Sequence, residues 1–133
     1  MKKISIASIL ALAVFAFSCK KDKDKSVLDM LQGKWYMTDT HYDLYFNGNH
    51  ITNSDTFYRG EYTLEFKGNQ AFGASNSGRD TSSFIVIDGP KLVTTDGDTT
   101  EIRKLTDSLL TFFYTDRSTP GNTAISTDNY KKY

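Results

Sequence analysis

The spacing of turn signals is the feature that most limits what this chain can fold into. Clusters of Gly, Asn, Asp, Ser and Pro recur beyond residue 33, and between Gly68 and Asp107 they follow one another about every ten residues. Regular short intervals of this kind are typical of the strands of an all-β sandwich or barrel. The clusters are Asn47–Asn49, Lys67–Asn69, Ser77–Gly78, Asp88–Pro90, Asp96–Asp98, Thr106–Ser108 and Thr119–Asn122.

The residues between these turns have the two-residue period of half-buried strands. In EYTLEFK (61–67) apolar and polar side chains alternate strictly, and in LLTFFYTD (109–116) Leu110, Phe112 and Tyr114 share one face, which predicts one buried face in each strand. The unbroken apolar run FIVI (84–87) predicts a strand covered on both faces. Ile102 and Leu105 fall on opposite phases of the alternation, which predicts a bulge or strand end between them.

We therefore predict an all-β domain, an eight-stranded up-and-down antiparallel barrel, because closure removes exposed sheet edges. A two-sheet sandwich is the alternative, and the short turns disfavour it. A short helix is expected at 26–32, where Ser26 and Asp29 suit a capping box, and a long polar connection at 47–60. The strands are expected near 33–46, 61–67, 70–76, 80–88, 91–96, 99–105, 109–116 and 124–131.

The N-terminal residues predict the cellular location of the protein. A basic start is followed by an apolar run from Ile4 to Phe17, which is typical of a signal peptide and too short to span a bilayer, since spanning takes about 20 residues. The run ends at Ser18-Cys19, which resembles the lipobox of bacterial lipoproteins. The resemblance implies that residues 1–18 are removed and that Cys19 receives a diacylglyceryl group with acyl chains such as palmitate.

Cys19 is the chain's single cysteine, so it has no partner for an intrachain disulfide. A buried thiol is the alternative to lipidation. Stable anchoring needs two acyl chains, and a diacylglyceryl group supplies them. In the segment 19–32 the lipidated Cys19 precedes a charged tether and the short helix. Lys20 follows Cys19 where an inner-membrane retention signal has Asp, so we expect the outer membrane, with its periplasmic or cell-surface face left open.

Three motifs, in order, resemble the lipocalin-like domain of small bacterial lipoproteins over residues 28–133: LQGKW (31–35), RGEYTLEF (59–66) and EIRKLTDSLLTF (101–112). The resemblance implies a barrel over 33–133.

In lipocalins the Gly-x-Trp pair, here Gly33 and Trp35, closes one end of the barrel. Classical lipocalins stack an Arg near the chain end on this Trp, whereas this chain has Lys131 and Lys132 there.

The sequence contains no recognisable catalytic or metal-binding motif. GASNSG (73–78) is a turn and not a nucleophile elbow. His41 and His50 are too few for a zinc site, and DGDTTE (96–101) lacks the frame of a calcium loop. We therefore expect no enzyme, no metal and no cofactor.

The net charge of the mature chain limits the classes of molecule that it is expected to bind. The signal peptide takes two of the 16 basic residues and none of the 16 acidic ones, which leaves a near-neutral mature chain. Nucleic acid is therefore not expected as a partner, because phosphate binding needs a basic face.

Two function classes remain. The first is a membrane-anchored barrel that binds a small apolar or amphipathic ligand in a narrow pocket near one mouth. Small or polar side chains in 71–75 and in 124–128, Asp128 among them, place the opening beside those strands. The pocket is expected to be lined by Phe66, Phe84, Phe112 and Tyr114.

The second class is an envelope protein-interaction module, such as a hydrolase inhibitor, that acts through its loops. The connection 47–60, with Tyr58 and Arg59, and the loop 116–124 are the candidate contact segments.

Overall fold

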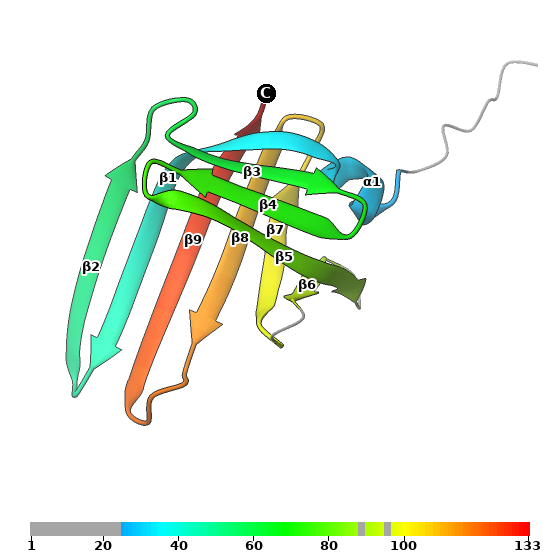
Figure 1. Cartoon of the computed structure of the whole chain (residues 1–133). Helices are drawn as coiled ribbons and strands as arrows, with labels where there is room; N and C mark the ends of the chain where they lie inside the picture. Colours follow the sequence, from blue (N-terminus) through cyan, green and yellow to red (C-terminus); the bar gives the residue numbers. More distant parts are fainter. Residues whose placement is uncertain (1–24, 88–89, 95–96) are drawn as a thin grey trace, which may run out of the picture.

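The computed structural model describes residues 25–87, 90–94 and 97–133. The predicted signal peptide, Cys19 and most of the predicted tether lie outside the described residues. Over the described part, the chain forms one helix and nine strands (Figure 1): α1 (Val27–Leu31), β1 (Gly33–Phe46), β2 (Asn49–Thr56), β3 (Tyr62–Lys67), β4 (Gln70–Ser75), β5 (Gly78–Ile87), β6 (Lys91–Thr94), β7 (Thr99–Leu105), β8 (Leu109–Asp116) and β9 (Asn122–Lys132).

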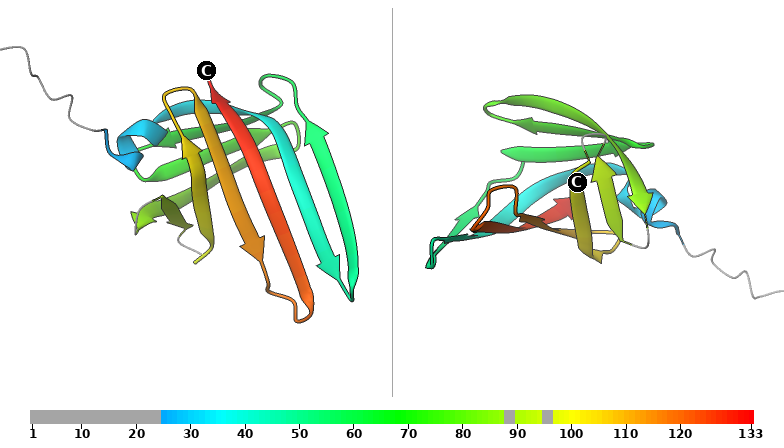
Figure 2. Two further views of the ribbon diagram at one scale, coloured as in Figure 1. Left: turned by 180° about the vertical axis from the view of Figure 1, so that it is seen from behind. Right: turned by 90° about the horizontal axis from the view of Figure 1, so that it is seen from below.

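Eight of these strands close into a barrel. From β3 to β9 each strand pairs antiparallel with the next, and β1 completes the ring by pairing with both β3 and β9. The first four residues of β1, Gly33 to Tyr36, pair with β3. Seen from below, β3, β4 and β5 lie across from β1, β9 and β8 (Figure 2). The predicted eight-stranded up-and-down antiparallel barrel is thereby confirmed, in preference to the sandwich.

The expected polar connection at 47–60 is wrong, because it contains β2, which pairs with the outer half of β1. Asn47 and Gly48 both have positive φ, at 47° and 79°, as a tight hairpin turn requires. The period-two pattern missed this strand because every residue of β2 is exposed. β2 extends the sheet of β1, β9 and β8 beyond the barrel (Figure 1).

The predicted helix is confirmed, together with its cap. Ser26 Oγ accepts a hydrogen bond from the backbone N–H of Asp29 at 3.1 Å, and the Asp29 carboxylate accepts one from Ser26 N–H. Gln32 then ties the end of the helix to the β3–β4 turn, because its side chain both donates to and accepts from the backbone of Gly68. The helix thereby places Leu31 inside the barrel.

Two further expectations concern single strands. The register of β7 against β8 shifts between Ile102 and Lys104, which confirms the predicted bulge. The expectation that 84–87 is covered on both faces is wrong, because Ile85 is 58% exposed while Phe84 is buried. A closed barrel covers only the inward side chains of a strand, and the outward ones meet water.

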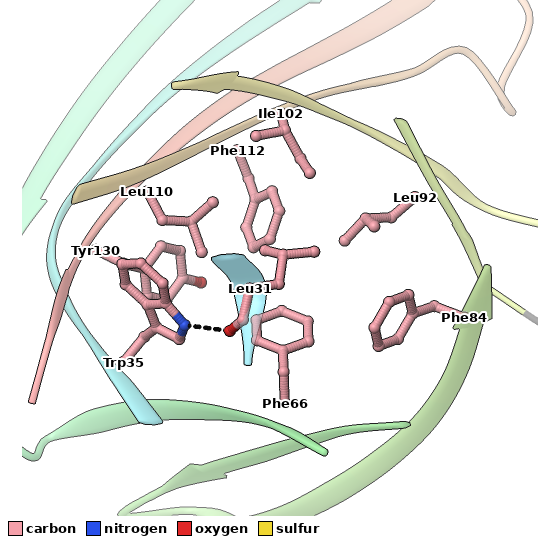
Figure 3. Close-up of a cluster of buried hydrophobic side chains, with 9 residues drawn as sticks. All are labelled: Leu31, Trp35, Phe66, Phe84, Leu92, Ile102, Leu110, Phe112 and Tyr130. Carbon is pink, nitrogen blue, oxygen red and sulfur yellow. Dashed lines mark hydrogen bonds between the residues drawn. The ribbon is translucent and has the colours of Figure 1, made fainter. Parts of the chain in front are cut away.

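The buried core fills one end of the barrel around Trp35 (Figure 3). Trp35 is fully buried and its Nε1 donates a hydrogen bond of 2.7 Å to the carbonyl of Leu31. The buried apolar residues are Leu31, Trp35, Phe66, Phe84, Leu92, Ile102, Leu110, Phe112 and Tyr130. This end is therefore closed by the helix and the indole together.

Lys132 completes the closed end. It pairs directly with Trp35 across β1 and β9, and its Nζ lies 4.9 Å from the centre of the indole ring. Gly33 leaves room for this approach, because an added Cβ would lie 3.3 Å from Lys132 Cε, which is closer than an ordinary contact. Its φ of +105° also disfavours any residue with a side chain. Of the two lysines near the chain end, Lys132 thus makes the cation–aromatic contact.

Candidate functional site

A cavity of about 300 Å³ lies inside the barrel beyond this core. Strands β3 to β9 all contribute to its wall, because each turns every second side chain inward. The lining residues are Leu64, Phe66, Ala71, Ser82, Phe84, Leu92, Thr94, Thr100, Phe112, Tyr114, Ser126 and Asp128.

All four residues expected to line a pocket, Phe66, Phe84, Phe112 and Tyr114, lie in the wall of this one cavity. Phe66 makes edge contacts with two of the others, with ring centres 5.3 Å from Phe84 and 6.3 Å from Phe112 (Figure 3). These aromatic pairs hold one another in place from three different strands. They therefore form a preorganised apolar wall.

Exposure along β8 shows where the cavity opens. The inward residues Leu110, Phe112 and Tyr114 are 1%, 8% and 39% exposed, in that order. The mouth is therefore at the Tyr114 end, away from α1. Ala71 of β4 and Ser126 of β9 line the same cavity, so small side chains from both of the expected strands border the space.

One lining residue is charged, among those that the structure describes in this wall. Asp128 of β9 lies directly opposite Phe112 of β8 and Thr40 of β1. Its Oδ1 accepts hydrogen bonds from Ser126 Oγ at 2.8 Å and from Thr40 Oγ1. Sequence reasoning counted Asp128 only as a small or polar side chain. Its place two residues from Tyr130, on the inward phase of β9, was the signal that it lines the interior.

The mouth has a negative electrostatic environment. The pKa of the Tyr114 phenol is raised first by burial and then by the charge of Asp116, with smaller contributions from Asp98 and Asp128 among others. Nearby carboxylates disfavour a further negative charge, so they oppose ionisation of the phenol. Tyr114 is therefore a neutral hydroxyl at the rim.

A second hollow, of about 380 Å³, lies between β1, β3, β4 and β5. Tyr130 borders it, and burial raises the pKa of this phenol well above its ordinary value. Leu64 lines both this hollow and the main cavity, so it separates them. Arg79 and Asp80 also border the second hollow, which makes it the more polar of the two.

The two histidines meet on the outer face of the β1–β2 hairpin. His50 Nε2 lies 2.7 Å from Asp43 Oδ1, and His41 Nε2 lies 3.2 Å from Asp43 Oδ2. The hydrogen bond with His50 is the main cause that lowers the pKa of Asp43. Among residues 25–87, 90–94 and 97–133, no group of three or more His, Cys, Asp or Glu is placed to hold a metal ion.

The loop residues proposed for protein contacts have different surroundings. Tyr58 is almost fully exposed. The Arg59 guanidinium instead packs over two aromatic rings, at 4.8 Å from Tyr133 and 5.3 Å from Tyr36. Arg59 therefore braces the barrel where β3 begins, and Tyr58 is the free side chain of the pair.

No family model, no curated protein and no solved structure matches this chain. None of the helices in the described part is long and apolar enough to cross a bilayer.

Proposed function

We propose that this protein is a membrane-anchored lipoprotein whose lipocalin-like barrel binds a small apolar or amphipathic ligand at the cell envelope. The observation that carries the proposal is the cavity of about 300 Å³ walled by Phe66, Phe84 and Phe112. An apolar wall of this kind favours the binding of apolar molecules, because the bound molecule buries apolar surface against it. The predicted anchor on Cys19 would hold the barrel at the outer membrane.

The size of the cavity limits the ligand. Ligand pockets in proteins span about 300–1,000 Å³, so this one is at the small end. An eight-stranded barrel has interior space for about one small ligand once its own side chains are placed. We therefore expect a single acyl chain or one small aromatic compound, bound in the micromolar range, about −8 kcal/mol. The barrel would bind and carry its ligand without catalysing a reaction or using a cofactor.

Titration with a neutral naphthyl dye that fluoresces in apolar surroundings tests this proposal. Phe112→Trp enlarges a side chain that lines the cavity, so we expect it to weaken dye binding at least about tenfold, or 1.4 kcal/mol. Phe113→Trp is the matched control, because Phe113 is the next residue on β8 and its ring packs against Arg103 and is no part of the wall. Equal effects of the two variants, or no binding by the parent, would overturn the proposal.

A second candidate function is binding of another envelope protein through the extension beyond the barrel. The observation in its favour is the pair Phe46 and Ile51, large apolar side chains that are exposed on the β1–β2 hairpin. Exposed apolar side chains in one region mark interaction sites. Under this function, Phe46→Ser with Ile51→Ser abolishes crosslinking to a partner that the parent captures and leaves dye binding unchanged. A partner that still crosslinks to the double variant would refute this surface.

A further inference from the structure

We propose that the ligand of this cavity is a cationic amphipath, with an apolar chain against the phenylalanines and an amine against Asp128. This inference rests on the proposed function and adds the charge of the ligand to it. It comes from the one charged side chain among the described residues of the cavity wall.

The hydrogen bonds of Asp128 orient its carboxylate without neutralising it. Thr40 Oγ1 and Ser126 Oγ both donate to Oδ1, and among the described residues no hydrogen bond ends on Oδ2. Hydroxyl donors hold a carboxylate in place and leave its net charge unchanged. Asp128 therefore keeps one oxygen and its negative charge available to a ligand.

The position of Asp128 suits the headgroup of a ligand that enters chain-first. Asp128 lies opposite Phe112, and its neighbour on the same face, Ser126, lies opposite Tyr114 at the mouth. An amine beside Asp128 would therefore sit one step inside the rim, with the apolar chain directed toward Phe66 and Phe84. Tyr114 also lines the cavity at its mouth, and aromatic rings attract cations that lie over their faces.

Two basic side chains of the barrel lie over aromatic rings that are not part of the cavity wall. Lys132 lies over Trp35 at the closed end, and Arg103 lies over Phe113, with its guanidinium carbon 3.2 Å from the ring centre. No Lys or Arg is among the described residues that line the cavity. An acid headgroup would thus meet Asp128 without a compensating charge, and such like-charge contacts select against the wrong ligand.

Three ligands with the same ten-carbon chain test the inference: decylamine, decanol and decanoate, each competing with the neutral naphthyl dye at neutral pH. We expect decylamine to bind about tenfold more tightly than decanol, which corresponds to about 1.4 kcal/mol, and decanoate to bind more weakly than decanol. The preference for the amine over the alcohol is also expected to shrink as salt is added.

Asp128→Asn is expected to bring decylamine to the affinity of decanol. Asp55→Asn is the matched control, since it removes the same charge from the exposed strand β2, and it should leave the ranking unchanged. The ranking in the parent protein decides the question even when Asp128→Asn does not fold.

The outcomes separate the two proposals. If decanol binds the parent as tightly as decylamine, or if both aspartate variants affect decylamine equally, the cationic ligand is refuted while the apolar cavity function stands. If neither the dye nor any of the three ligands binds, the proposed function fails, and this inference fails with it.

Discussion

Replacing Trp35 with alanine tests whether the indole holds the closed end of the barrel together. Three features stabilise this side chain. The indole is fully buried in the core, its Nε1 donates a hydrogen bond to the carbonyl of Leu31, and the ammonium of Lys132 lies over the ring. The change removes all three at once and leaves a void beneath α1.

The expected cost follows from these contacts. Truncating a buried Trp to Ala typically costs about 3–5 kcal/mol. Within that total, the lost hydrogen bond accounts for about 1 kcal/mol, and the lost cation–aromatic contact for about 0.5–1 kcal/mol. Small domains have about 5–15 kcal/mol of stability in all, so Trp35→Ala removes a large share.

The measurement is thermal unfolding followed by circular dichroism. At about 4 °C per kcal/mol for a domain of this size, the midpoint should fall by at least about 12 °C. Trp35→Phe keeps an aromatic ring under Lys132 but leaves the Leu31 carbonyl without its donor, so its midpoint should lie between those of the parent and Trp35→Ala. The parent's fluorescence comes from this single tryptophan and should be blue-shifted.

A Trp35→Ala protein that melts within about 3 °C of the parent would refute this reasoning, since that is less than 1 kcal/mol. A parent emission typical of an indole in water would refute it independently, because the structure gives this side chain no exposure.

Three further predictions concern other parts of the chain. Cys19→Ala should leave the precursor without its lipid and either release it from the membrane fraction or block its processing; a mass and a fractionation identical to those of the parent would refute the anchor. Gly33→Ala should cost about 1–3 kcal/mol because of its φ of +105°, whereas Gly73→Ala, whose added Cβ meets nothing nearer than 4.0 Å, should leave the melting midpoint within a few degrees. His50→Ala should raise the lowered pKa of Asp43 toward its ordinary value in a carboxyl NMR titration, and an unchanged pKa would refute the contact. The folded state lowers this pKa, so the stability that the contact adds is present above the pKa of Asp43 in the unfolded chain. This stability is lost as the pH falls through the pKa of Asp43 in the folded protein.

Local patterns were sufficient to locate most of the strands. β3 and β8 were predicted within one residue of their observed bounds, because alternation and turn residues act over a few neighbouring positions. The same holds for the Ser26–Asp29 capping box. The sequence predicted a first strand and then seven more strands with short turns between them. This arrangement favoured an antiparallel barrel. β2 was not predicted because all its side chains are exposed and all but Ile51 are polar, so its only strong signal was the Asn47-Gly48 turn.

The candidate site was predictable to the extent that alternation decides which side chains face inward. Phe66, Phe112 and Tyr114 lie on the inward phase of β3 and β8, and the cavity brings them together with Phe84. The apolar run 84–87 left the inward residue of β5 open between Phe84 and Ile85. The register of β5 against its neighbours decided in favour of Phe84.

The sequence by itself thus determined the eight strands of the barrel, their order and the identity of the indole that fills the core. Only the tertiary structure decided which lysine covers Trp35 and which residue of β1 donates a hydrogen bond to the inward-facing Asp128. Both depend on the pairing of β1 with β9, the two ends of the domain, which places Lys132 opposite Trp35 and Thr40 opposite Asp128. Residues so far apart in the chain carry no mutual signal in a single sequence, because their contact exists only after the barrel has closed.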